Sequence, residues 1–289
     1  MINNNINFEN ENIKHMYQDG IEYIQFKKLL NFSEINHAYI LKTNNMNFRM
    51  GKDFRNLEIV KTNLKKVSDV IGFDFNNIIR PDYEHTNNVE IISFKDETEI
   101  PSLSGKMFKD TDGLITDKNE IAIISTNADC NLILIYDPIK GIIGNIHAGW
   151  RGTFGKIASK AIRKMKEEYD CNPKDIICCF CPSIRKCHFE VEDDVESKCE
   201  EIFKYTGMLD KIISKGDIKN GKQKYYIDTI LINKLMLKEE GILDESIIDS
   251  GICSVCNKEK VHSKRAEGDN FDLGCALIQK ANERIRNKK

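Results

Sequence analysis

The chain has 289 residues, a net charge of −2 at pH 7 and a pI near 6.3. Lysine and arginine are interspersed with aspartate and glutamate along most of the chain, which excludes the concentrated basic surface typical of nucleic-acid-binding proteins. The first residues lack the basic flank and apolar core of a signal peptide, and no apolar run approaches the ~20 residues of a membrane span. We therefore expect a soluble cytoplasmic protein that does not bind membranes.

The first segment of the chain is polar and rich in asparagine. Residues 1–20 are predicted as an N-terminal extension that is either frayed or an edge strand, which the sequence does not separate. No linker interrupts the rest, so residues 21–289 are predicted to form a single domain.

Alternating apolar residues predict strands along the chain, and apolar residues at helical spacing predict helices. The expected strands are 21–29, 37–43, 89–94, four strands within 113–148, 175–184 and 222–230. The expected helices are 55–73, 153–169, 193–207, 232–242 and 276–289. Several neighbouring strands must pair antiparallel, so the predicted class is α+β (mixed α/β), with mixed or antiparallel sheets flanked by outer helices.

Three residues stand out as candidate metal ligands and catalytic residues: His85, Cys130 and His147 each lie at the edge of a strand-like run. Two imidazoles and a thiolate suit zinc, and three protein ligands with an open fourth position are typical of catalytic zinc sites. Such a metal lowers the pKa of a bound water. The residues alone leave alternatives open: structural histidines with a buried cysteine, or a metal-free Cys130–His147 pair acting as a hydrolase.

The remaining cysteines form a second pattern. A disulfide framework belongs to short secreted domains, so ten cysteines in this chain are expected as thiols, ligands or a nucleophile. The group 178–188 contains four cysteines and His188, and Cys253 and Cys256 form a CxxC pair. A structural zinc knuckle joining them is one interpretation, whereas the apolar setting of 178–181 favours buried thiols.

The segment NADCNLILIYDPIKGIIGNIHAGWRGT, residues 127–153, resembles the signature of the YfiH/YlmD family of laccase-domain, polyphenol-oxidase-like proteins. HTNNV resembles another family segment, with Thr86 in place of glycine, and CPSIRKCHFEVEDDV resembles a third, with Cys181 in place of glycine. DGLITDKNEIAIIST, YYIDTILINKLMLKEEGI and ICSVCNKEKVHSKRAEGD follow the family order as well. The resemblance covers roughly residues 45 to 280.

This resemblance implies a YfiH-like fold and a metal site formed by His85, Cys130 and His147, usually assigned to zinc, with copper as the alternative. It implies phosphorolysis of adenosine, inosine or methylthioadenosine and deamination of adenosine, so the expected partners are a purine nucleoside and inorganic phosphate. Ala266 and Asp272 stand where the family has arginines, which removes a candidate contact to phosphate or substrate.

Residues beside His147 suggest how substrates bind. Arg151 and Gly152 lie where a helix is expected to begin, near Thr153, and a helix N-terminus suits phosphate. The alternative is an Arg151 salt bridge that holds the turn. Asp129 is expected to make structural hydrogen bonds, a direct catalytic role being the alternative, and Trp150 either stacks on a purine or packs internally.

Three other functions compete with a purine nucleoside enzyme. They are the metal-free cysteine hydrolase, a copper polyphenol oxidase and a non-catalytic binding protein. The multiple His-x-His runs that a multicopper cluster needs are missing from the sequence, which disfavours the copper oxidase. The sequence leaves the oligomeric state open.

Overall fold

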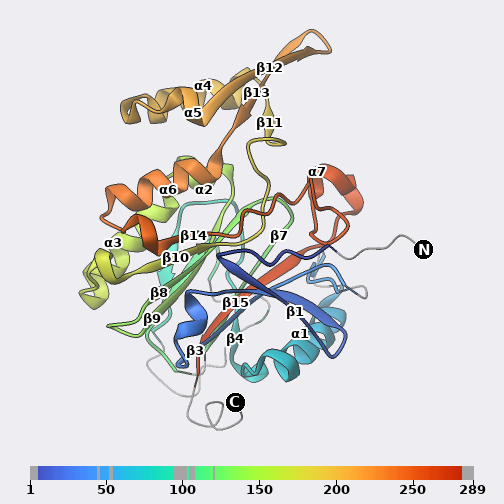
Figure 1. Cartoon of the computed structure of the whole chain (residues 1–289), viewed down its shortest axis with the longest axis vertical. Helices are drawn as coiled ribbons and strands as arrows, with labels where there is room; N and C mark the ends of the chain where they lie inside the picture. Colours follow the sequence, from blue (N-terminus) through green and yellow to red (C-terminus); the bar gives the residue numbers. More distant parts are fainter. Residues whose placement is uncertain are drawn as a thin grey trace.

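The computed structural model describes residues 6–43, 46–51, 55–93, 103, 108–119 and 121–281. Within these residues the chain forms two six-stranded sheets and one three-stranded sheet (Figure 1). The two large sheets share one apolar core, because residues such as Ile123 and Ile278 of the first pack with Leu134 and Ile143 of the second. The predicted α+β class with mixed sheets is therefore confirmed.

The first sheet has the strand order β1-β2-β3-β15-β7-β4. Its strands are β1 (Ile13–Gln18), β2 (Ile21–Phe26), β3 (Ile35–Ile40), β4 (Ile78–Ile79), β7 (Ala122–Asn127) and β15 (Gly274–Lys280). All of its pairs are antiparallel except β4 with β7. Strand β1 lies within the predicted N-terminal extension and forms an edge of this sheet, as the edge-strand alternative expected.

The second sheet has the strand order β14-β10-β8-β9-β6-β5. Its strands are β5 (Val89–Ile91), β6 (Gly113–Thr116), β8 (Asn131–Asp137), β9 (Ile142–Ala148), β10 (Ile177–Phe180) and β14 (Ile247–Asp249). The central strands β8 and β9 are buried along their whole length, which explains their run of isoleucine and leucine. The sequence correctly predicted the four strands β6 to β9.

A tight turn joins β8 to β9. The Asp137 side chain accepts hydrogen bonds from the backbone N–H groups of Ile139 and Lys140, and the Gly141 N–H donates to the Asp137 carbonyl. Gly141 has φ +66°, which glycine adopts without strain. This turn sets a register in which Asn131 lies opposite Ala148 and Leu132 opposite His147.

Helices cover the outer faces of both large sheets. Helix α1 (Leu57–Ile71) buries Val60, Leu64 and Val67 on the first sheet and ends at Gly72, which is left-handed at φ +83°. On the second sheet lie α3 (Ile157–Tyr169) and α6 (Thr229–Glu239). Each fully buried aliphatic side chain contributes about 1.5–3 kcal/mol, so these faces hold the helices in place.

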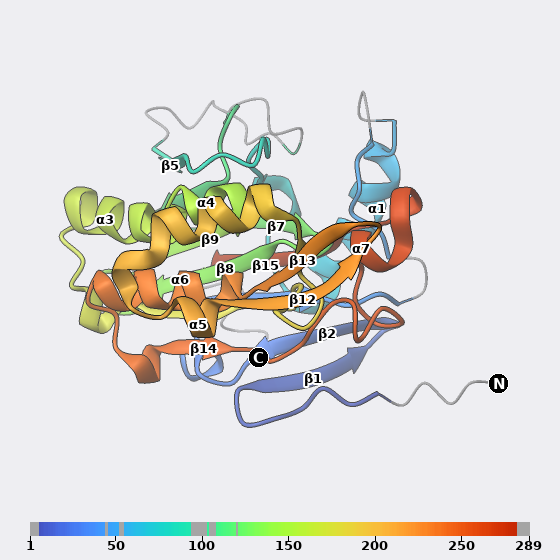
Figure 2. The same cartoon turned by 90° about the horizontal axis from the view of Figure 1, so that it is seen from above.

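A smaller unit stands at one end of the two stacked sheets (Figures 1 and 2). Its sheet has the order β11-β13-β12, from β11 (Glu190–Val191), β12 (Ile213–Lys219) and β13 (Lys222–Ile227). The helices α4 (Asp193–Phe203) and α5 (Leu209–Ile212) complete it, and their apolar side chains pack with residues of α6. The short helix α7 (Lys264–Glu267) follows β14 by a long connection.

Two predicted helices differ from the structure. Residues 276–280, the first part of the helix expected at 276–289, instead belong to β15, which lies between β3 and β7; residues 282–289 lie outside the described residues. The helix expected at 153–169 is two helices, α2 (Trp150–Phe154) and α3. They separate because Lys156 is left-handed at φ +61° and the Gly155 carbonyl accepts a hydrogen bond from the Asn87 side chain.

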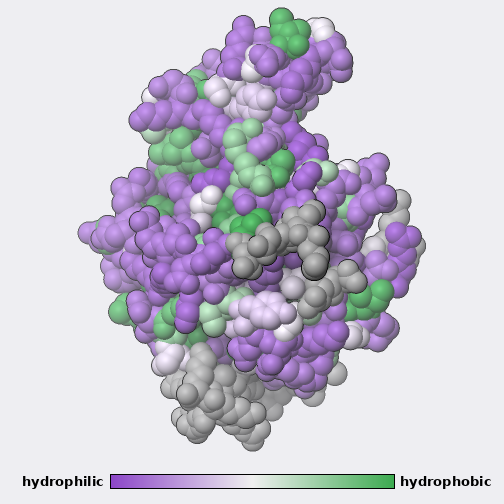
Figure 3. Space-filling view, turned by 45° about the vertical axis from the view of Figure 1, so that its right-hand side comes forward, coloured by the Kyte–Doolittle hydropathy of each residue, from purple (hydrophilic) through white to green (hydrophobic). Residues whose placement is uncertain are grey.

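The visible surface is mostly hydrophilic (Figure 3). Exposed large apolar side chains in the described residues are scattered, and single residues of this kind are normal on protein surfaces. They are Tyr17, Leu30, Ile59, Ile139, Tyr205, Ile218 and Leu243. In the part of the chain that the structure describes, every helix is too short or too polar to serve as a membrane span.

Candidate metal centre and pocket

His85, Cys130 and His147 come together at one end of the second sheet. One ligand atom of each lies within 4.8 Å of the others. Cys130 directly precedes β8 and His147 is the penultimate residue of β9, so the antiparallel register of these strands brings the two side chains together. His85 comes from the loop between β4 and β5, where its backbone is left-handed at φ +58°.

Asp112 connects the two histidines. Its Oδ1 is 2.8 Å from His147 Nδ1, and its Oδ2 accepts hydrogen bonds from the backbone N–H and the hydroxyl of Thr86, which follows His85. The Asp112 carbonyl also accepts the His147 backbone N–H at 2.7 Å. With Nδ1 donating to Asp112, Nε2 of His147 is the nitrogen left for a ligand.

Gly149 allows the three side chains to meet. A Cβ atom at this position would lie 3.0 Å from His85 Cδ2 and 3.3 Å from Cys130 Sγ. Any larger residue therefore pushes against two candidate ligands at once, which explains a glycine directly after β9.

The electrostatics of the group favour a thiolate. Burial raises the pKa of Cys130, but the neighbouring His147 charge and hydrogen bonds from His147 and His85 outweigh it and lower that pKa to about 6. Burial lowers the pKa of His147, and the Cys130 thiolate with Asp112 raises it to about 9. Burial raises the pKa of Asp112, but its contacts with His147 and Thr86 lower it overall.

The donor set fits a zinc ion. A thiolate and two imidazole nitrogens are borderline-soft donors, and His147 has the carboxylate partner that metal-bound histidines usually have. Three protein donors would leave a zinc ion one position for a further ligand. Cys130 is partly exposed and His85 is exposed, so a small molecule could reach the group.

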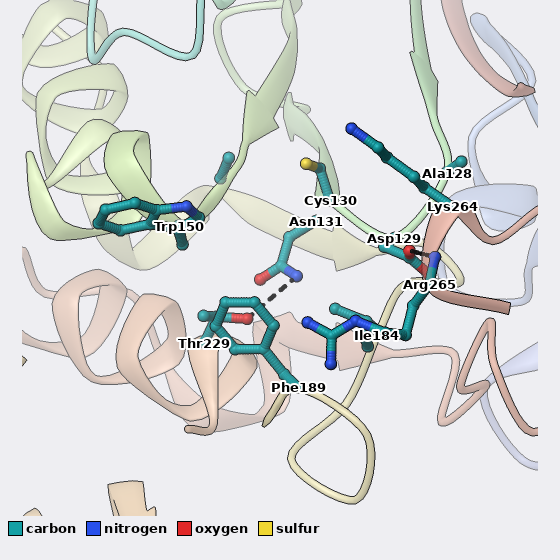
Figure 4. A pocket seen from close by; sticks show the side chains of 11 residues that line it. Ala128, Asp129, Cys130, Asn131, Trp150, Ile184, Phe189, Thr229, Lys264 and Arg265 are labelled. Carbon is teal, nitrogen blue, oxygen red and sulfur yellow. Dashed lines mark hydrogen bonds between the residues drawn. The ribbon is translucent and has the colours of Figure 1, made fainter. Parts of the chain in front are cut away.

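A pocket of about 440 Å³ opens beside Cys130 (Figure 4). This volume is in the range of small-molecule sites. Its lining combines the aromatic rings of Trp150 and Phe189, the polar side chains of Asn131 and Thr229, and two cationic side chains. The full lining is Ala128, Asp129, Cys130, Asn131, Ala148, Trp150, Ile184, Phe189, Thr229, Lys264 and Arg265.

Asp129 makes the structural hydrogen bonds expected of it, although it precedes β8 and also lines the pocket. Its Oδ1 accepts hydrogen bonds from the hydroxyls of Ser254 and Ser263, both at 2.6 Å, and its Oδ2 accepts from the Arg265 N–H at 2.7 Å. These bonds hold Asp129 at φ +92° and join the loops around α7 to the residue that precedes Cys130.

Arg151 and Gly152 lie apart from this lining. The exposed Arg151 guanidinium stacks over the Trp150 ring at 4.3 Å. A Cβ at Gly152 would lie 2.6 Å from the Thr86 carbonyl oxygen, so this glycine packs closely on the His85 loop. The phosphate role of both residues stays a prediction.

Sequence reasoning assigned no role to Asp112, Phe189, Lys264 or Arg265. Asp112 precedes β6, and a carboxylate at a strand end was the available signal. Lys264 and Arg265 belong to the segment ICSVCNKEKVHSKRAEGD, which resembles a family segment, but their position beside Cys130 depends on the fold.

Residues 35–278 match the family model described as multi-copper polyphenol oxidoreductase laccase. The chain is 26% identical over 213 residues to a purine nucleoside phosphorylase, YlmD, of Bacillus subtilis, covering 74% of each. It is 30% identical over 207 residues to adenosine deaminase RL5 from an unknown prokaryote, covering 69% of this chain and 74% of the relative.

The fold also matches solved structures. The crystal structure of the Bacillus licheniformis hypothetical protein YfiH superposes with a TM-score of 0.79 at 22% identity, over 92% of this chain and 98% of that one. The predicted YfiH-like fold is thus confirmed.

Proposed function

Because the chain belongs to the family described as multi-copper polyphenol oxidoreductase laccase, whose relatives above are named for purine nucleoside reactions, we propose that it is a purine nucleoside enzyme. The proposed reactions are phosphorolysis of adenosine, inosine or methylthioadenosine and deamination of adenosine. The observation that carries the proposal is the convergence of His85, Cys130 and His147 beside a pocket with aromatic and cationic walls.

We propose zinc as the metal held by these three residues. A zinc ion with an open position supplies Lewis-acid chemistry. Because Nδ1 of His147 donates to Asp112, Nε2 would be the nitrogen that holds the ion, and Gly149 leaves room for the three ligands. A multicopper oxidase needs more histidines: in the described residues, the two groups with metal-ligand spacing contain three histidines between them.

The pocket suggests how substrates are oriented. The rings of Trp150 and Phe189 offer faces for a purine base, and Asn131 and Thr229 offer polar atoms for ring nitrogens or the ribose. Lys264 and Arg265 supply the positive charge that phosphate needs at this pocket. We favour them over Arg151 and Gly152, because Arg151 lies outside the lining and the helix it begins, α2, has only five residues.

In phosphorolysis a phosphate oxygen forms a bond to C1′ of the ribose, the C1′–N9 bond breaks, and the purine leaves with the bonding electrons and gains a proton. The geometry supports placing the purine against the aromatic walls and phosphate on the cationic side. In deamination water replaces the amino group at C6, and ammonia leaves.

The test is to incubate the purified, zinc-loaded protein with adenosine, with and without phosphate. Adenine plus ribose 1-phosphate supports phosphorolysis, and inosine supports deamination. Cys130→Ala is expected to reduce both to background, whereas Cys199→Ala, which alters a buried thiol in α4, keeps them. If protein with one zinc ion bound at the site of His85, Cys130 and His147 does not convert adenosine, the proposal is contradicted.

The proximity of Cys130 and His147 favours one second candidate, a metal-free hydrolase in which the thiolate is the nucleophile. Alkylation of Cys130 in zinc-free protein discriminates, since full hydrolase activity after alkylation rules this candidate out.

A further inference from the structure

A second group of metal-binding side chains lies away from His85 and His147. Cys187 and His188 come from the loop between β10 and β11, and Cys253 and Cys256 come from the turn after β14. Cys178, Cys179 and Cys181, which the sequence placed in the same cluster, are instead fully buried in the apolar cores. All ten cysteines are described, and each is an unpaired thiol.

Five distances between donor atoms of the second group are close to those expected for four ligands of one zinc ion. The Cys187 Sγ lies 3.6 Å from Cys253 Sγ and 3.9 Å from Cys256 Sγ. His188 Nδ1 lies 3.2, 3.7 and 3.5 Å from the sulfurs of Cys187, Cys253 and Cys256. Tetrahedral zinc bonds of about 2.3 Å to sulfur and about 2.05 Å to nitrogen place two sulfurs about 3.8 Å apart, and a sulfur and a nitrogen about 3.6 Å apart.

We propose that Cys187, His188, Cys253 and Cys256 bind a second zinc ion. Three thiolates and one imidazole are a structural ligand set, and four protein donors leave no open position for substrate. This ion therefore has a structural role, and the proposal does not depend on the function of the first site.

The backbone around the group is already arranged for a metal. Ser183 and Cys253 form a bridge between the two segments, and the Ser254 N–H donates to the Ser183 carbonyl at 3.0 Å. The N–H groups of Val255 and Cys256 point to the Cys253 sulfur, the arrangement expected of a CxxC turn that holds its first thiolate.

The second zinc ion would hold one wall of the pocket. His188 directly precedes Phe189, which lines the pocket. The His188 carbonyl accepts a hydrogen bond from the Arg265 guanidinium at 2.9 Å. On the other segment, Ser254 donates to Asp129, the neighbour of Cys130. Both segments that the ion joins therefore contact the pocket, although the two sets of ligands are separate.

Zinc analysis of the purified protein tests the proposal. We expect two zinc ions per wild-type chain, one in Cys256→Ser, one in Cys130→Ala and none in the double variant; Cys199→Ser, the control, keeps two. Cys256 is exposed, so its substitution spares the core. Cobalt bound to Cys130→Ala should give the intense visible absorption of a tetrahedral thiolate site, which Cys256→Ser removes in the double variant.

The outcomes separate the two sites. Wild-type protein with one zinc that Cys130→Ala removes and Cys256→Ser leaves untouched overturns the second site. A mass lower by two hydrogens with Cys187 linked to Cys253 also overturns it, because it assigns the group to a disulfide. One zinc that persists in Cys130→Ala and is lost in Cys256→Ser supports the second site and removes the metal from the proposed function.

Amide hydrogen exchange gives a readout without activity. Removal of zinc from Cys130→Ala with a chelator should increase exchange at the backbone of 185–190 at least about tenfold, because the ion no longer restrains this loop. Unchanged exchange contradicts the structural role.

Discussion

Asp112 Oδ1 accepts a hydrogen bond from Nδ1 of His147 at 2.8 Å, and both groups are buried. The same carboxylate holds the loop of His85 through Thr86. One side chain thus orients two of the three candidate ligands from outside the metal centre.

Asp112→Asn is expected to lower zinc affinity at the first site about 10- to 100-fold. The amide can turn its NH₂ group toward His147 and donate a hydrogen bond to Nδ1. The proton of the neutral ring is then on Nε2, the nitrogen needed for zinc. Competition with a chromophoric chelator measures the affinity. The variant should keep the wild-type circular dichroism spectrum, and unchanged affinity would show that Asp112 has only a structural role.

Gly149→Ala should also weaken zinc binding while the protein stays folded. The added methyl group meets His85 and Cys130 at 3.0 and 3.3 Å, so at least one ligand must move. Gly144→Ala, within the preceding strand β9, is the matched control, since its Cβ has only ordinary contacts of 3.4–3.5 Å. Equal zinc affinity in the two variants would contradict the role assigned to Gly149.

Zinc should protect Cys130 from alkylation. The bound thiolate shares its electron pair with the metal, so iodoacetamide is expected to label Cys130 at least about tenfold more slowly in zinc-loaded than in zinc-free protein. Mass spectrometry of the Cys130 peptide separates this labelling from that of exposed Cys187 and Cys256. Equal labelling rates would exclude Cys130 as a ligand.

Lys264→Met is expected to raise the KM for phosphate about tenfold with a smaller effect on the KM for adenosine. The reason is the loss of about 1.4 kcal/mol from one charge-assisted contact. Lys160→Met, on the exposed side of α3, serves as the control. If Arg151→Met raises the phosphate KM and Lys264→Met does not, phosphate binds at α2 instead.

The stability of the fold should depend on Asp249 at acid pH. Its carboxylate bonds Arg185 at 2.8 and 2.6 Å and Lys234 at 2.7 Å; burial raises its pKa, but these cations lower it well below the usual 3.8. Because the pKa of Asp249 is lower in the folded than in the unfolded protein, its ionised carboxylate stabilises the fold. This stabilisation is complete at pH values above the unfolded-state pKa and is lost as the pH falls through the folded-state pKa. Asp249→Asn should therefore cost about 3 kcal/mol of unfolding free energy at pH 7.

Urea unfolding of wild type and Asp249→Asn between pH 2 and pH 7 measures this difference. The difference in unfolding free energy between the two proteins should be constant above about pH 5 and decrease below about pH 4. A gap that stays constant down to pH 2 would show that the cations do not stabilise the ionised carboxylate.

Local patterns predicted much of this fold. The spacing of Val60, Leu64 and Val67 with a terminal glycine was enough for α1, and continuous apolar runs with turn residues were enough for β8 and β9. The helix expected from residue 276 was wrong at residues 276–280, because a strand buried on both faces shows no alternation and its apolar run also fits a helix.

The candidate site was only partly predictable for a related reason. Three residues with rare side chains and a family signature suggested His85, Cys130 and His147. Asp112, Lys264 and Arg265 carry common charges, and their importance arises from contacts between segments far apart in the sequence. The break between α2 and α3 likewise depends on Asn87, a residue distant in the chain.

The turn at Asp137–Gly141 has a consequence at the opposite end of the hairpin. The seven residues of β8, at about 3.3 Å each, separate the turn from Cys130 by about 23 Å. Inserting or deleting one residue in this turn would slip the pairing by one position and send alternate side chains to the other face. A turn outside the candidate centre therefore helps to align Cys130 with His147, and a change in its length that shifted the register would separate the two side chains.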